Sequence, residues 1–99
     1  MKIKTSIKLE YKNGRFRKLT MFETDPQVAE QEVDGEVTKR RPATVQDMKI
    51  ALRKSLATMM RDSKIRSFTD HETGKVVIIR FTDVDEIEIG VEEVVENEG

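Results

Sequence analysis

Apolar and polar residues alternate strictly along residues 2–11. A period of two, rich in β-branched residues, is typical of a half-buried strand. One face of the predicted strand is polar and the other is apolar enough to join a core. The residues on the apolar face are Ile3, Thr5, Ile7, Leu9 and Tyr11.

The dipeptide Asn13-Gly14 follows this strand and predicts a hairpin, because both central positions of a type I′ turn require positive φ. A second strand is expected from Arg15 to about Glu23. A plain two-residue loop would place Leu9 opposite Lys18, so we predict a β-bulge near Arg17-Lys18. In that register the cross-strand pairs are Leu9 with Leu19 and Ile7 with Met21.

Residues 25–43 allow two interpretations. Asp25-Pro26 at the start and the basic run before Pro42 suggest a long connection, and connections of this length are usually functional or disordered. Alternatively, residues 33–37, centred on Asp34-Gly35, close a short second hairpin. The sequence does not separate these two readings.

An amphipathic helix is predicted from Thr44 to about Asp62. Thr44 and Asp47 have the spacing of a capping box, with Asp in place of Glu. Apolar residues then recur every three or four positions, which indicates one buried stripe. The stripe consists of Val45, Met48, Leu52, Leu56 and Met59, and the basic residues off it are Lys49, Arg53, Lys54 and Arg61.

Three further strands are expected in the last third of the chain. Residues 65–70 form the first, residues 71–74 a turn, and residues 75–82 a largely apolar strand. An unbroken apolar run is typical of a central strand covered on both faces, or of a strand at an oligomer interface. After a turn at 83–85, residues 86–92 alternate again, with Ile87, Ile89 and Val91 expected to face inward, and residues 93–99 are expected to form a frayed acidic tail.

The predicted order is therefore β-β-α-β-β-β. The fold class is α+β: one domain over residues 1–92, with a mainly antiparallel sheet and one amphipathic helix packed on one face. Ninety-nine residues suffice for a single core. The absence of cysteine excludes disulfides, thiolate metal sites and a cysteine nucleophile. Neither a signal peptide nor a membrane span is indicated, so a cytoplasmic location is expected.

The distribution of charged residues along the chain says more about function than the overall composition does. The net charge is only −1, but the charges are sorted into four blocks along the chain. Residues 1–20 hold seven basic and one acidic side chain, and residues 21–36 hold six acidic and no basic ones. Residues 37–66 hold nine basic and two acidic, and residues 67–99 hold two basic and ten acidic.

Two explanations fit these blocks. If the acidic C-terminal strand lies beside the basic N-terminal strand, Glu86 and Glu88 face lysines across the ladder and help to select which strands pair. Otherwise the cations form a binding surface for a protein or for nucleic-acid phosphates. The candidate binding residues are Lys8, Lys12, Arg15, Arg17, Lys18, Lys39, Arg40, Arg41 and Arg53.

The sequence gives little support for a catalytic site or a metal site. His71 is the only histidine and lies in a predicted turn, and the chain contains none of the common hydrolase, zinc or phosphate-loop motifs. Four carboxylates fall within residues 83–88, but the spacing and glycine of a calcium loop are missing. We therefore expect no metal, cofactor or small-molecule substrate.

The sequence thus favours a non-catalytic protein-binding or accessory module that acts through charge-segregated surfaces. Its partner would be a larger protein or further copies of itself. The alternative is a nucleic-acid-binding protein that uses the basic hairpin and the run Lys39–Arg41.

Overall fold

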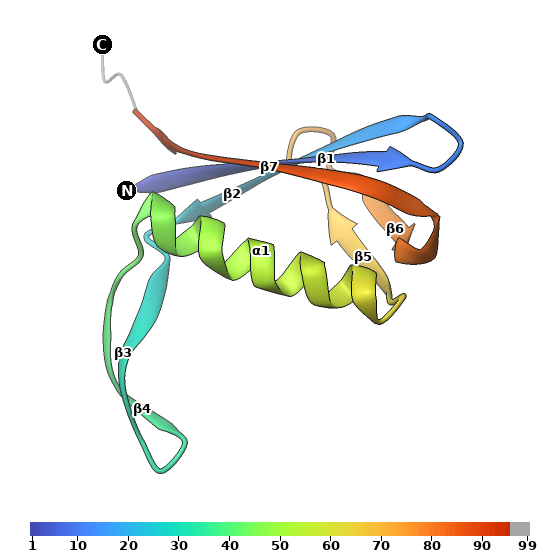
Figure 1. Ribbon diagram of the computed structural model, residues 1–99. Helices are drawn as coiled ribbons and strands as arrows, with labels where there is room; N and C mark the ends of the chain where they lie inside the picture. The colour runs from blue at the N-terminus through green and yellow to red at the C-terminus, as the bar shows by residue number, and fades with distance from the viewer. Residues whose placement is uncertain (96–99) are drawn as a thin grey trace.

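The computed structural model describes residues 1–95, which form one α+β domain with the order β-β-β-β-α-β-β-β (Figure 1). The predicted fold class is confirmed, with two strands more than the predicted order. The elements are β1 (Lys2–Tyr11), β2 (Phe16–Thr24), β3 (Gln27–Val33), β4 (Glu36–Pro42), α1 (Val45–Arg61), β5 (Ile65–Thr69), β6 (Val76–Arg80), the 3₁₀ turn η1 (Phe81–Asp83) and β7 (Val84–Val94).

The main sheet is antiparallel, with the strand order β2-β1-β7. The predicted alternation along β1 is confirmed, since Ile3, Ile7 and Leu9 are almost completely buried on one face. Ile7 lies between Leu19 of β2 and Ile89 of β7. This face carries the core, whose main cluster of buried residues consists of Ile7, Leu9, Leu19, Leu56, Val77, Ile79, Phe81 and Val84.

The predicted β1–β2 register is wrong, and so is its bulge. The strands pair continuously, with Ile7 opposite Leu19 and Leu9 opposite Arg17. The reason lies in the loop: only Gly14 has positive φ, at 85°, and the Tyr11 amide donates to the Arg15 carbonyl at 2.8 Å. A three-residue loop with one left-handed glycine shifts the register by one residue relative to a type I′ turn.

Residues 27–42 form a hairpin rather than an unstructured connection. Asp34 and Gly35 have φ of 53° and 80°, as the two central positions of a type I′ turn require, and Val33 pairs with Glu36. We call this hairpin the arm. It projects away from the rest of the molecule (Figure 1), and all its residues are exposed except Val28 and Arg41, which are half-buried.

The capping box of α1 is confirmed. The Thr44 hydroxyl accepts from the Asp47 amide at 3.1 Å, and the Asp47 carboxylate accepts from the Thr44 amide at 2.8 Å. The helix runs along the inner face of the sheet at β7 (Figure 1). Only Leu56 of its apolar stripe is fully buried, and Met48 and Leu52 stay half-exposed. We call the described part of the molecule outside the arm the body. Packing within the body leaves much of the helix's apolar surface uncovered.

The apolar run of residues 75–82 does not form a central strand. Within residues 1–95, β6 pairs only with β5 in a two-stranded hairpin. Val77 and Ile79 point into the core, whereas Val76 and Ile78 are 66% and 72% exposed. The turn of this hairpin contacts the outer edge of β2, where the His71 amide donates to the Thr20 carbonyl at 2.8 Å.

The C-terminal strand is longer than its alternation suggests. It begins at Val84 and continues to Val94, into the stretch expected to be a frayed tail. Residues 96–99 of that predicted tail lie outside the described residues.

Candidate binding site

The outer edge of β7 is open. Among residues 1–95, β7 has β1 on one side and no strand on the other, and α1 lies beneath the uncovered side (Figure 1). An edge strand presents backbone N–H and C=O groups to any further strand that lies alongside it. The uncovered edge therefore supplies regularly spaced hydrogen-bonding groups next to a helix.

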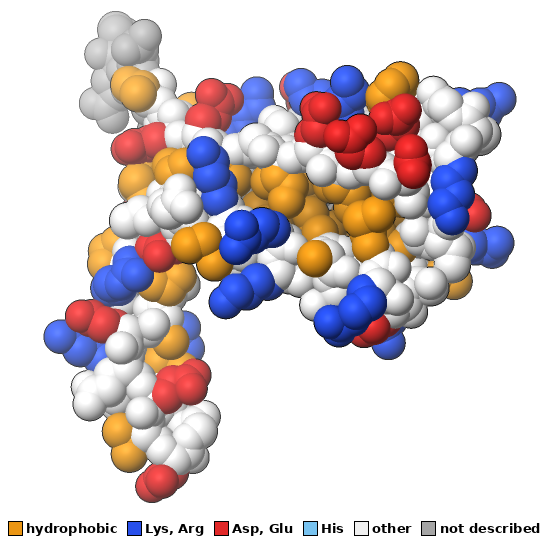
Figure 2. All heavy atoms as spheres, viewed as in Figure 1, with side chains coloured by type: hydrophobic (Ala, Val, Ile, Leu, Met, Phe, Trp, Pro, Cys, Tyr) orange, Lys and Arg blue, Asp and Glu red, His pale blue; other side chains and the backbone are white. Residues whose placement is uncertain are grey.

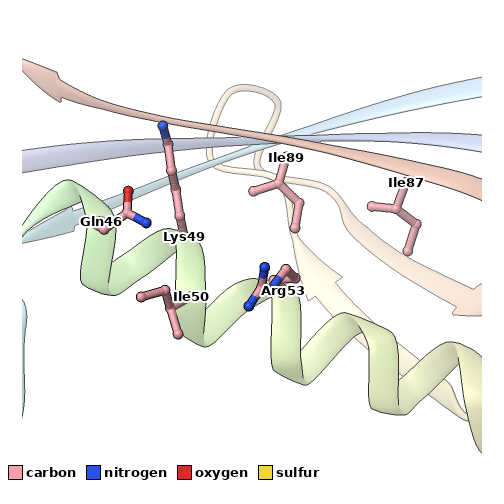
Figure 3. A pocket seen from close by; sticks show the side chains of 6 residues that line it. All are labelled: Gln46, Lys49, Ile50, Arg53, Ile87 and Ile89. Atoms are coloured by element: carbon pink, nitrogen blue, oxygen red, sulfur yellow. The ribbon is translucent and has the colours of Figure 1, made fainter.

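A hollow of about 410 Å³ lies between this strand and α1. Ile87 and Ile89 project into it from β7, and Ile50 lies on the helix, exposed by 38% (Figure 3). Figure 2 shows the apolar floor directly, between acidic side chains along its upper rim and basic ones below. The residues lining the hollow are Gln46, Lys49, Ile50, Arg53, Ile87 and Ile89.

The helix side of the hollow is cationic. Lys49 extends from α1 toward β7, and Arg53 lies one turn further along (Figure 3). Neither forms an ion pair with another of the described residues. The site can thus take an apolar side chain on its floor and an anionic group at its helix rim.

The basic hairpin predicted from the sequence lies elsewhere. Lys8 and Lys18 face each other across β1 and β2 on the outer face of the sheet. The Lys8 ammonium lies 4.6 Å from the ring centroid of Phe16, which is 59% exposed. Arg17 falls on the opposite face, across from Leu9, while Lys12 and Arg15 belong to the loop. The predicted cations of this hairpin are therefore split between two faces.

The second predicted cluster is at the other end of the molecule (Figure 1), on β4. Arg41 binds both carboxylate oxygens of Asp47, at 2.7 and 3.1 Å. That hydrogen-bonded pair, with the Thr44 amide, holds the pKa of Asp47 well below its usual range. Lys39 lies 3.8 Å from Glu30, and Arg40 is exposed. Arg41 thus secures the root of the arm to the helix N-terminus.

Some residues of the basic and acidic blocks are neighbours within the main sheet. Lys4 lies 3.9 Å from Glu92, and Lys8 is directly opposite Glu88. The same prediction is wrong for Glu86, whose neighbour on β1 is Glu10. Exposed pairs of this kind contribute only about 0.2–1 kcal/mol each, so they favour the β1–β7 pairing without dominating stability.

His71 has a structural contact in the turn between β5 and β6. Its Nδ1 accepts from the Phe22 amide at 2.8 Å, so the histidine caps the edge of β2. Within residues 1–95, no three His, Cys, Asp or Glu side chains gather as metal ligands would. No helix in that part of the chain is long and apolar enough to cross a membrane.

Of the predicted binding residues, only Arg53 lies at the hollow. Sequence reasoning missed Ile50, and it placed Ile87 and Ile89 on an inward face without seeing that this face is partly open. The available signal was Ile50 itself, an apolar residue off the helix's apolar stripe. Comparisons with protein-family models, with curated proteins and with solved structures found no match to this chain.

Proposed function

We propose that this protein is a non-catalytic protein-binding module that receives an extended protein segment along β7. The observation that carries the proposal is the position of the apolar hollow: it lies directly between the open edge of β7 and the cationic side of α1. Strand edge, apolar floor and charged rim are the three parts that peptide recognition by strand addition requires.

The proposed binding mode divides affinity and specificity between these parts. Backbone hydrogen bonds to β7 supply affinity for any extended segment. Ile50, Ile87 and Ile89 favour an apolar side chain at one position of that segment, because its burial removes apolar surface from water. Lys49 and Arg53 favour a neighbouring carboxylate. The preferred partner segment is thus extended, apolar and acidic.

A peptide selection tests this proposal. A library of random linear peptides is selected against the protein, and the binders are ranked by fluorescence anisotropy. We expect sequences in which apolar and acidic residues alternate. Their dissociation constants should be in the micromolar range, which corresponds to a binding free energy on the order of −8 kcal/mol. Ile50→Glu should weaken them by about tenfold or more, since it puts a charge on the apolar floor.

The matched control is Ile78→Glu, which makes the same change at an exposed isoleucine on β6. It should leave peptide binding unchanged. Equal loss in both variants, or binders that ignore Ile50→Glu, would exclude the hollow as the site.

Nucleic-acid binding is the second candidate, favoured by the exposed Phe16, which lies beside the Lys8–Lys18 pair on the outer sheet face. An aromatic ring flanked by cations can stack on a base while the cations bind phosphates. Anisotropy titrations with labelled single- and double-stranded DNA and RNA at two salt concentrations decide this case. Steeply salt-dependent binding that Phe16→Ala weakens would support it, and no binding at low salt would exclude it.

A further inference from the structure

The arm has almost no support from its own molecule. It is a two-stranded hairpin whose residues are exposed except for the half-buried Val28 and Arg41. It is held at its root, where the Ala43 amide donates to the Pro26 carbonyl at 2.8 Å and Arg41 binds Asp47. Isolated two-stranded hairpins are only marginally stable in water. An arm of this kind gains stability when a second surface covers it.

The distal half of the arm has a distinct chemistry. Its exposed apolar residues are Val33 and Val37, at 49% and 37%. Around them, residues 30–37 carry carboxylates and no cation: Glu32, Asp34 and Glu36 form no ion pair with another described residue, whereas Glu30 lies 3.8 Å from Lys39. An extended, apolar and acidic segment is what the hollow between α1 and β7 is suited to bind.

We propose that the arm of one copy lies in the hollow between α1 and β7 of a second copy, so that the protein assembles with itself. This inference rests on the proposed function and identifies its partner. Val33 or Val37 would cover the isoleucine floor, and the carboxylates at the tip would meet Lys49 and Arg53. At the apolar floor and at the basic helix rim, each surface supplies what the other lacks; the carboxylates would face that basic rim and not the acidic rim above it (Figure 2).

The contact is between molecules because of where the arm points. It leaves the body at the N-terminal end of α1 and extends away from the hollow of its own copy (Figure 1). The arm and the hollow are different surfaces, so two copies can exchange arms reciprocally as a closed dimer, or many can join head to tail as a ring or filament. The mass of the assembly distinguishes these forms.

Disulfide trapping tests the contact directly, because the chain contains no cysteine. Val33→Cys and Ile50→Cys are prepared separately, mixed and oxidised mildly, and cross-linked peptides are identified by mass spectrometry. We expect the 33–50 pair to dominate. The matched control mixes Val33→Cys with Ile78→Cys, whose isoleucine is 72% exposed on β6. Equal yields in both mixtures would overturn the inference.

Charge reversal tests the same contact without oxidation. Glu32→Lys on the arm and Arg53→Glu at the hollow should each raise the dissociation constant of the assembly about tenfold, measured by analytical ultracentrifugation. The two variants mixed together, or combined in one chain, should recover most of the loss. Two single effects that add instead of cancelling would contradict a direct contact.

The results also separate this inference from the proposed function. A wild-type chain that stays monomeric at the highest attainable concentration, yet binds acidic peptides in the hollow, overturns self-assembly and keeps the binding module. A chain that neither assembles nor binds selected peptides overturns both. Assembly that survives replacement of residues 27–42 by a short glycine-serine linker assigns the contact to another surface and also overturns the inference.

Discussion

Two carboxylates join segments that are distant in the sequence. Asp47 caps α1 and binds Arg41 at the root of the arm. Asp70 is 7% exposed and accepts from the Thr20 amide at 3.2 Å, the Glu72 amide at 3.1 Å and the Thr73 hydroxyl at 3.1 Å. It thereby ties the β5–β6 turn to the edge of β2. Both residues hold together parts of the fold that are far apart in the sequence.

Asp70→Asn should reveal this role through its pH dependence. Burial raises the pKa of Asp70, but hydrogen bonds from the Glu72 and Thr20 amides and the Thr73 hydroxyl outweigh it, so the pKa is lowered. A lowered folded-state pKa stabilises the protein above the unfolded-state pKa of about 3.9, and that stabilisation is lost as the pH falls through the folded value. The variant should therefore be less stable than wild type at neutral pH, and the difference should shrink in acid.

Urea unfolding between about pH 7 and about pH 3 measures this difference. Asp85→Asn, at an exposed position of β7, is the control and should show little effect at any pH. A difference for Asp70→Asn that stays constant across the whole range would show that the carboxylate's charge plays no part.

At the scale of elements, α1 has two separate tasks. Leu56 is 4% exposed and packs into the core, whereas Ile50 is 38% exposed and faces the hollow. The two residues are nearly equal in size and lie on one helix, which makes them a matched pair for separating stability from binding.

Leu56→Ala should lower the free energy of unfolding by about 3 kcal/mol, since it removes buried methyl groups and leaves a cavity. Ile50→Ala should cost less than about 1 kcal/mol, because its side chain is 38% exposed, against 4% for Leu56. Chemical denaturation gives both values, and peptide anisotropy should show the reverse order. If Ile50→Ala is as destabilising as Leu56→Ala, the hollow is part of the folded core and not a site.

At the scale of the whole molecule, the body and the arm differ in how they are stabilised. The body has a continuous core between the main sheet, α1 and the β5–β6 hairpin. The arm has its cross-strand hydrogen bonds and two anchoring contacts at its root. Local opening of the arm therefore requires far less free energy than global unfolding.

Amide hydrogen exchange should show this difference. In dilute solution, amides of β3 and β4 should exchange much faster than those of β1, because opening the arm exposes no core residue. At concentrations where copies assemble, the arm and β7 should become protected together. Protection of the arm equal to that of β1 in dilute solution would show that the arm belongs to the body's cooperative unit.

Particular residues show which features of the fold could be predicted from the sequence and which could not. Alternation along β1 identified Ile3, Ile7 and Leu9 as core, and the Thr44–Asp47 spacing identified the helix start, because both patterns depend on neighbours within a few residues. The register of β2 depended on whether Asn13 as well as Gly14 takes a positive φ, which the dipeptide alone does not decide. The apolar run around Ile78 indicated burial, yet alternate residues of β6 face water.

The sequence by itself determined the class of the fold, the main strands, the helix with its cap, and the sorting of charge along the chain. These follow from periodicity, turn chemistry and composition, which are local properties. Only the tertiary structure decided that β7 is an open edge, that Ile50, Ile87 and Ile89 share a hollow with Arg53, and that the arm stands free of the body. Those features depend on which surfaces the packing leaves uncovered, and no local pattern encodes what remains exposed after the chain has closed on itself.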